Sequence, residues 1–279
     1  MKIEKYLETI EDLSTLKIAV TGATSGVGHE LVHHLVKKGA KVVLLALEDD
    51  LGKKVQAEHP ENVIDVIKYD QSSFRSIEES INLLLERHPD IDTYVLDAGT
   101  LGEKGLTIDG YARTIGVNYC GVKHFIDYLS NKVGDRKIRF VIQGSIVGGL
   151  RLKKNTDLRN EKLGFFTQYN VSKIYLEAYF YKLFKENKYQ NIEYILTEPG
   201  ITSTNITRNM PKFIRVLGKG FLLVFFHHPN KACLTLLKGI CPSTPNGSYI
   251  VPRGLLTMSG YPKIKEFPNK RKREYLFKE

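Results

Sequence analysis

The stretch Ile18–Gly39, "IAVTGATSGVGHELVHHLVKKG", places an apolar run, a glycine-rich turn and a segment of helical period in direct succession. The first part combines apolar and β-branched residues, which is typical of a buried strand. Four apolar side chains of the last part fall on one face of a helix, namely Leu31, Val32, Leu35 and Val36. Gly39 is then suited to end that helix. A strand, a turn and a helix in this order predict one unit of a parallel sheet covered by helices.

The same alternation continues from residue 17 to about residue 251 and predicts an α/β fold. We expect one doubly wound domain over residues 1–279, with helices on both faces of the sheet, because no repeat or low-complexity linker divides the chain. Seven parallel strands are expected, at Lys17–Thr21, Lys41–Ala46, Val63–Tyr69, Thr93–Leu96, Ile138–Gln143, Ile192–Leu196 and Ser248–Val251. The pattern lapses in residues 147–166 and again between Pro199 and Pro229.

The composition is that of an ordinary globular protein, with 42% hydrophobic and 26% charged residues. Its three cysteines, Cys120, Cys233 and Cys241, form no CxxC motif, which argues against a disulfide framework and against a thiolate metal site. We expect no metal. The charged amino terminus does not resemble a secretory signal, so a reducing, cytoplasmic setting is predicted.

The net charge of +10 raises the question of an anionic partner. No nucleic-acid motif accompanies the charge, so we expect no nucleic-acid partner. Basic residues gather in 151–162 and in the tail 263–279, where a solvated surface is expected and a phosphate or an anionic membrane is the alternative. The apolar run Phe213–Phe226 is interrupted by Arg215 and Lys219 and is too short to span a bilayer.

Three glycines, Gly22, Gly26 and Gly28, lie in the turn between the first strand and the first helix. Glycine lets the backbone approach a ligand closely, and the start of a helix presents free N–H groups to a pyrophosphate. The turn therefore predicts a dinucleotide site, and tight packing is the alternative interpretation. Asp70 and Asp97 follow the third and fourth strands, at the edge of the sheet where ligands collect; Asp70 could instead be a turn or cap residue.

A serine, a tyrosine and a lysine are expected to converge at the same edge. Ser145 follows the fifth strand, and Tyr169 and Lys173 are four positions apart on the next helix. An ammonium beside a phenol favours its ionised form, so we predict that Lys173 lowers the pKa of Tyr169. Such a phenol exchanges protons near neutral pH, whereas Ser145 is placed to hydrogen-bond a substrate oxygen. Taken singly, the serine could be a cap and the tyrosine a packing residue.

From Leu16 to about Tyr261 these motifs resemble the short-chain dehydrogenase/reductase family, which implies a Rossmann-type fold. "TGATSGVG" resembles its cofactor loop, "LDAG" its NNAG element, "GSIVG" its serine segment, "YNVSK" its YxxxK and "EPGITST" its PG element. The resemblance implies a catalytic set of Ser145, Tyr169, Lys173 and Asn118. It implies cofactor contacts from Gly22, Thr24, Ser25, Gly26, Val27, Gly28, Asp70, Gln71, Asp97, Ala98, Gly99, Asn118, Tyr169, Lys173, Pro199, Gly200 and Thr204.

Within the family, "LTIDGYARTIGVNYCGVKHF" and "DLRNEK" are most similar to the retinol dehydrogenase and protochlorophyllide reductase branch. That branch carries an insertion between serine and tyrosine, here residues 146–168. The resemblance assigns residues 16–145 mainly to cofactor binding and 200–230 to a substrate lid. We therefore expect an enzyme that interconverts a carbonyl and an alcohol on a lipophilic or aromatic small molecule, with Tyr169 as general acid and base.

Two departures from the family pattern matter. Asp97 stands where the family usually has Asn, which removes an amide donor. At the end of the second strand, Ala46 replaces the Asp of many NAD-preferring members and Leu47 replaces the Arg usual in this branch. Without an acidic residue at position 46, we expect NADP rather than NAD, with Lys53 or Lys54 reaching the 2′-phosphate; Glu48 argues the other way.

The alternative function is a nucleotide-bound sensor or scaffold with little turnover, possible because Leu47 and Asp97 depart from the family pattern. The apolar run Phe213–Phe226, together with the basic tail, could instead lie in a membrane interface, although a core or lid is favoured for it. The family's habit of pairing through helices beside the sheet implies a homodimer or homotetramer. The substrate, the direction of the reaction and the oligomeric state are left open by the sequence.

Overall fold

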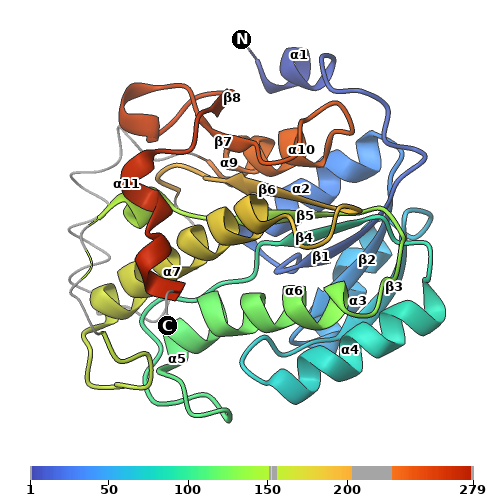
Figure 1. Ribbon diagram of the computed structural model, residues 1–279. Helices are drawn as coiled ribbons and strands as arrows, with labels where there is room; N and C mark the ends of the chain where they lie inside the picture. Colours follow the sequence, from blue (N-terminus) through green and yellow to red (C-terminus); the bar gives the residue numbers. More distant parts are fainter. Residues whose placement is uncertain (1, 151, 153–155, 203–227, 278–279) are drawn as a thin grey trace.

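Eight strands form one sheet in the part of the chain that the computed structural model describes, which is residues 2–150, 152, 156–202 and 228–277 (Figure 1). Their order is β3-β2-β1-β4-β5-β6-β7-β8, and β8 alone among them pairs antiparallel to its neighbour. The strands are β1 (Lys17–Thr21), β2 (Lys41–Ala46), β3 (Val63–Lys68), β4 (Thr93–Leu96), β5 (Ile138–Gln143), β6 (Ile192–Thr197), β7 (Tyr249–Pro252) and β8 (Pro262–Lys265). The doubly wound α/β prediction is confirmed.

The seven expected strands are β1 to β7, with ends that shift by at most one residue. The eighth, β8, was missed by the sequence prediction. Its sequence "PKIK" exposes both lysines and Ile264, so it lacks the buried apolar run by which the other strands were predicted. Lysines on an outer strand also discourage pairing with another chain.

Helices cover both faces of the sheet (Figure 1). The longer ones are α2 (Gly26–Lys37), α3 (Asp49–Glu58), α4 (Phe74–Arg87), α6 (Val122–Ser130), α7 (Phe165–Glu186) and α10 (Leu234–Ile240). The short ones are α1 (Ile3–Leu7), α5 (Arg113–Ile115), η1 (Gly116–Gly121), η2 (Ile146–Gly149), α9 (Pro229–Ala232), η4 (Leu255–Thr257), α11 (Asn269–Lys272) and η5 (Glu274–Phe277). As predicted, Gly39 follows the first long helix, with φ +85°.

Alternate side chains of each central strand enter two separate cores. In β1, Ala19 packs with residues of α4, α6 and α7, whereas Ile18 and Val20 pack with residues of α2, α3 and α10. Strands buried on both faces have continuous apolar sequences, which is why apolar runs located them. The order of the strands reverses between β1 and β4, and this reversal creates the crevice in which such sheets bind ligands.

The basic tail folds back onto the domain. Figure 1 shows α11 beside α7, and Phe277 packs on the rings of Tyr175 and Tyr179 with centroids 6.5 and 6.3 Å away. Arg271 is only 7% exposed. The expectation of a solvated tail is therefore wrong for Arg271, because buried carboxylates surround it. Among the described residues, no helix is both long and apolar enough to cross a bilayer.

Candidate active site

The glycine turn between β1 and α2 is packed tightly against the end of β4. Gly22 has φ +74°, and a Cβ there would lie 2.9 Å from the backbone of Ala98. A Cβ on Gly28 would lie 2.5 Å from the carbonyl oxygen of Gly22. Packing alone therefore explains glycine at both positions. The first residues of α2, which starts at Gly26, also line the cavity, so the tight packing does not conflict with a dinucleotide site at this turn.

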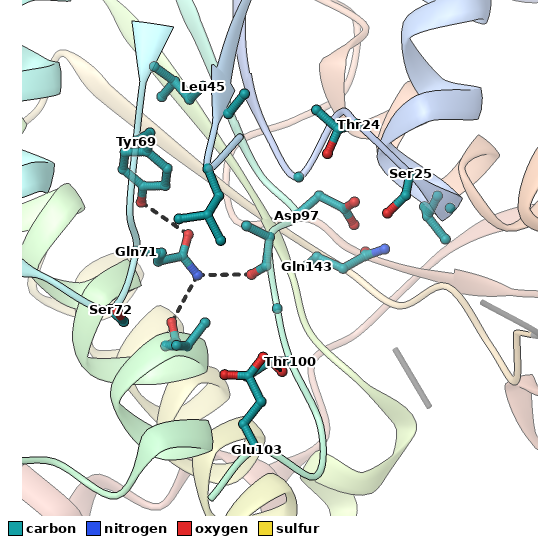
Figure 2. Close-up of a pocket in the computed structure, with 18 of the residues that line it drawn as sticks. Thr24, Ser25, Leu45, Tyr69, Gln71, Ser72, Asp97, Thr100, Glu103 and Gln143 are labelled. Atoms are coloured by element: carbon teal, nitrogen blue, oxygen red, sulfur yellow. Dashed lines mark hydrogen bonds between the residues drawn. The ribbon is translucent and has the colours of Figure 1, made fainter. Parts of the chain in front are cut away.

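A cavity of about 710 Å³ runs along the carboxyl ends of the strands. At one end it is lined by Leu47 and Asp70, and at the other by Ser145, Tyr169 and Lys173. Predicted cofactor residues on its wall are Gly22, Thr24, Ser25, Gly26, Val27, Asp70, Gln71, Asp97, Ala98, Gly99, Tyr169, Lys173, Pro199 and Gly200 (Figure 2 shows part of this wall). Gly28 and Asn118 lie behind that wall. Thr204 and most of the expected 200–230 lid lie outside the described residues.

Ser145, Tyr169 and Lys173 meet at one end of this cavity. The hydroxyl of Tyr169 lies 3.5 Å from the Oγ of Ser145 and donates to it. Ser145 also caps η2, its Oγ accepting from the backbone N–H of Val147 at 3.5 Å. The ammonium of Lys173 donates to the carbonyl oxygen of Gln143 at 2.8 Å, which fixes it beneath the end of β5. The cap interpretation of Ser145 and its position beside the phenol are therefore both correct.

The expected effect of Lys173 on the phenol is not observed, since the pKa of Tyr169 is raised rather than lowered. Burial is the largest cause; the hydrogen bond with Ser145 works against it, and the carboxyls of Glu177 and Asp97 add to it. Burial also lowers the pKa of Lys173 to about 8, although Asp97 and Glu177 oppose that change. The prediction treated Lys173 as a solvated cation. In the structure both side chains are buried, and burial disfavours the charged form of each.

Asn118 lies in η1, a π-helical turn between α5 and α6. Its side-chain oxygen accepts from the N–H of Thr100 at 2.8 Å, and its amide donates to the Thr100 carbonyl at 2.9 Å. The amide also donates to the hydroxyl of Ser172 at 3.3 Å, on the helix that carries Tyr169 and Lys173. Asn118 therefore joins the loop after β4 to α7. π-helical turns in α-helices are frequent at functional sites.

Asp70 and Gln71 are held mainly by protein groups. Asp70 forms a local turn, its carboxylate accepting from the N–H and hydroxyl of Ser72 at 2.8 and 2.7 Å. The Gln71 amide donates to the carbonyls of Ala98 and Val117, and its oxygen accepts from Tyr69 (Figure 2). The contacts of Asp70 are therefore those of a turn residue, as the alternative interpretation had it. Both Asp70 and Gln71 also line the cavity.

The sequence model of the short chain dehydrogenase family matches residues 17–214, which is more than half of the chain. The chain belongs to the short-chain dehydrogenase family. Members of this family are oxidoreductases that bind NAD or NADP. The match covers the glycine turn, Asn118, Ser145, Tyr169 and Lys173.

Several relatives agree with this assignment. The chain is 26% identical to an uncharacterised oxidoreductase of Schizosaccharomyces pombe, over 88% of this chain and 80% of that protein. It is 28% identical to short-chain dehydrogenase reductase 3a of Arabidopsis thaliana, over 47% of this chain and 51% of that protein. A crystal structure from Mycobacterium paratuberculosis has the same fold, with a TM-score of 0.76 at 17% identity over 97% of this chain and 92% of that one.

Of the residues that depart from the family pattern, Asp97 shows the clearest electrostatic effect. Burial raises the pKa of its carboxyl to about 7, with the charge of Lys173 acting in the opposite direction. A Cβ on Gly28 would lie 2.9 Å from Asp97 Oδ2, so the carboxyl packs directly under the glycine turn. An asparagine there would carry no charge to bury.

Among the described residues near the end of β2, two lysines are engaged by other protein groups. Leu47 is 53% exposed on the cavity wall. Lys53 forms an ion pair with Asp49 at 2.8 Å on the surface of α3. Lys68, at the end of β3, donates to the backbone carbonyl of Leu47 and was missed by the sequence prediction. Lys68 lies on the strand next to β2, where it pairs with Ala46, and the sequence alone does not reveal this pairing.

A buried ionic cluster beneath the active site was also missed. It consists of Glu177 on α7, Glu198 after β6, Tyr249 on β7 and Arg271 on α11. One Arg271 nitrogen donates to Glu177 at 3.2 Å, to the Tyr249 hydroxyl at 2.8 Å and to Glu198. Glu177 in turn accepts from the backbone N–H of Ser145 at 3.3 Å. The C-terminal tail therefore supports the segment that carries the serine.

Proposed function

We propose that this chain interconverts a carbonyl and an alcohol on a lipophilic or aromatic small molecule, using NADP or NAD. The proposal rests on one observation: Ser145, Tyr169 and Lys173 meet at one end of a cavity that the glycine turn also lines. The lipophilic substrate class rests on the resemblance and on the apolar residues 213–226.

The residues present are suited to a dinucleotide. The start of α2 lines the cavity, and Gly22 and Gly26 have φ values of +74° and +61°, which favour glycine, so no side chain at these positions blocks a ligand. When bound, the dinucleotide supplies or accepts a hydride. Ser145 holds the substrate oxygen by a hydrogen bond, and Tyr169 gives that oxygen its proton in reduction or removes it in oxidation. Lys173 and Asn118 are proposed to pass protons to Tyr169.

The test is to follow oxidation of NADPH and NADH by the purified protein against a panel of aldehydes, ketones and quinones. Turnover of at least one apolar carbonyl compound is expected. Tight dinucleotide binding with no turnover across the panel would favour the alternative of a nucleotide-bound sensor or scaffold. Light scattering on the same sample measures whether a homodimer or homotetramer forms.

A preference for NADPH over NADH is the expected result of titrating both cofactors. Ala46 and Leu47 provide no carboxylate to repel a 2′-phosphate, and Lys68 lies beside them. In Leu47→Arg, a guanidinium is added at an exposed position, so NADPH should bind about tenfold more tightly and NADH should be unaffected. Leu47→Gln is the uncharged control. A natural protein that prefers NADH contradicts the NADP assignment.

The rate of carbonyl reduction is expected to fall as the pH rises through about 8, the lowered pKa of Lys173. Below that pH the ammonium is charged and favours the transfer of a proton through Tyr169, whereas above it the charge is lost. Lys173→Arg keeps a cation at all these pH values, so its pH–rate profile should lack the inflection near pH 8, even if its rate is lower. An unchanged inflection in that variant assigns the titration to another group, such as Asp97.

A further inference from the structure

Two histidines and a glutamate gather where α2 meets the end of α3, away from the cavity described above. His29 and His33 are four residues apart on α2, so their rings share one helix face. Glu58 is the last residue of α3. The side chains are 27%, 33% and 46% exposed, which leaves them accessible to an ion from solvent.

The separations of the three side chains are those of metal ligands. The Nε2 atoms of His29 and His33 lie 3.2 and 3.7 Å from the same oxygen of Glu58. All three ligand atoms lie within 4.8 Å of one another. In a tetrahedral zinc site with bonds of about 2.0–2.1 Å, ligand atoms are about 3.3 Å apart. Small rotations of the side chains would therefore bring all three atoms to bonding distance of one ion.

A fourth residue holds one ring in the required orientation. His59 Nε2 lies 2.6 Å from His33 Nδ1, so the Nε2 of His33 is left directed at Glu58. His59 caps α3, and its carbonyl accepts from the N–H of Val63 at 2.8 Å at the start of β3. Histidines that bind metals commonly use their second nitrogen in this way, which fixes the tautomer.

We propose that His29, His33 and Glu58 bind a divalent transition-metal ion of the Zn²⁺ class, with His59 as a positioning residue. Two imidazoles and a carboxylate are ligands that Zn²⁺ prefers, and a fourth position remains open to solvent. The ion would join α2, whose first turn faces the cofactor crevice, to α3. This site is independent of the proposed function, because none of its residues lines the catalytic cavity.

The test is calorimetric titration of ZnCl₂ into the full chain without a polyhistidine tag, after treatment with a chelator. We expect one ion per chain with a dissociation constant of about 10 µM or lower. His29→Gln, His33→Gln and Glu58→Gln should each weaken binding at least about tenfold. Saturating Zn²⁺ should raise the Tm of the natural protein by roughly 5 °C and that of His33→Gln by much less.

A matched control comes from another histidine that pairs with a glutamate. His124 lies 2.8 Å from Glu78 between α6 and α4, but no second histidine joins that pair in the described structure. His124→Gln should bind Zn²⁺ as the natural protein does. His59→Gln should keep the stoichiometry and lose about tenfold in affinity, as expected for a residue that acts through His33.

Three results overturn the proposal. The first is the absence of stoichiometric binding at about 100 µM Zn²⁺. The second is unchanged binding in both His29→Gln and His33→Gln. The third is an equal loss of affinity in His124→Gln. Cobalt absorption spectra separate loss of the metal site from loss of the fold. A tetrahedral Co²⁺ site gives an intense visible band, which the ligand variants should lack. Circular dichroism should show that these variants remain folded.

Discussion

Tyr169→Phe is expected to slow turnover by orders of magnitude while leaving the fold and dinucleotide binding intact. The phenol hydroxyl lies 3.5 Å from Ser145 Oγ, and the phenylalanine ring fills the same space without an exchangeable proton. A positioned general acid contributes about 10²- to 10⁴-fold to rate, so the rate constant for carbonyl reduction should fall by that factor. The measurement is single-turnover oxidation of the bound reduced cofactor, which separates chemistry from binding.

The matched control is Tyr175→Phe, on the same helix. Tyr175 packs against Tyr119 and Phe277 and does not line the cavity, so its hydroxyl has no place in the proposed chemistry. That variant should turn over as the natural protein does. If Tyr169→Phe matches the natural protein on a substrate that reacts, the assignment of Tyr169 as acid and base is wrong.

Arg271→Met is expected to cause the largest loss of stability of any single change in the tail. Glu177 and Glu198 have fully buried carboxyls, and Arg271 is the cation between them. Removing one partner of a buried ion pair costs about 3–5 kcal/mol, because the remaining charge has lost water and gains no partner. Thermal unfolding measures the loss, and Lys270→Met, an exposed change in the same short helix, is the control.

The loss should depend on pH with a defined sign. Burial raises the pKa of Glu177 to about 8, and the charge of Arg271 is the largest influence against that rise. Without Arg271 the pKa rises further. A carboxyl with a raised pKa in the folded state favours folding at low pH, and this advantage disappears as the pH rises toward the folded pKa. Arg271→Met should therefore be closest to the natural protein in mild acid and weakest above neutrality.

Glu177→Gln in the Arg271→Met background tests the cause. If the buried charge of Glu177 is responsible, the second change should restore part of the lost Tm, most of all at high pH. Equal losses at every pH would instead point to lost packing of α11. Because Glu177 also accepts from the N–H of Ser145, the arginine variant should lose activity along with stability.

The parts of the site that could be predicted are those encoded in short stretches. The glycine turn, the strand ends and the i,i+4 pair Tyr169 and Lys173 each follow from residues that are close in sequence. Parallel strands end at one edge, so the order of elements was enough to bring Ser145 and Tyr169 together. The family match from residue 17 to 214 agrees with the predicted family and fold.

Other features depended on partners that no local pattern reveals. The direction of the pKa shift of Tyr169 follows from burial and from Glu177 and Asp97, which the helix spacing did not include. The strand β8 was missed because most of its side chains are exposed, so it contains no apolar run. Arg271 was interpreted as part of a solvated tail, since a run of basic residues is usually on the surface.

The sequence by itself determined the doubly wound sheet, the glycine turn and the serine, tyrosine and lysine that meet at its edge, because periodicity and turn chemistry act over a few residues. Only the tertiary structure decided that Arg271 lies between Glu177 and Glu198, 94 and 73 residues away, and that His29 and His33 face Glu58. Such contacts depend on how whole helices pack, and the burial that follows shifts the pKa values of the groups in the proposed chemistry.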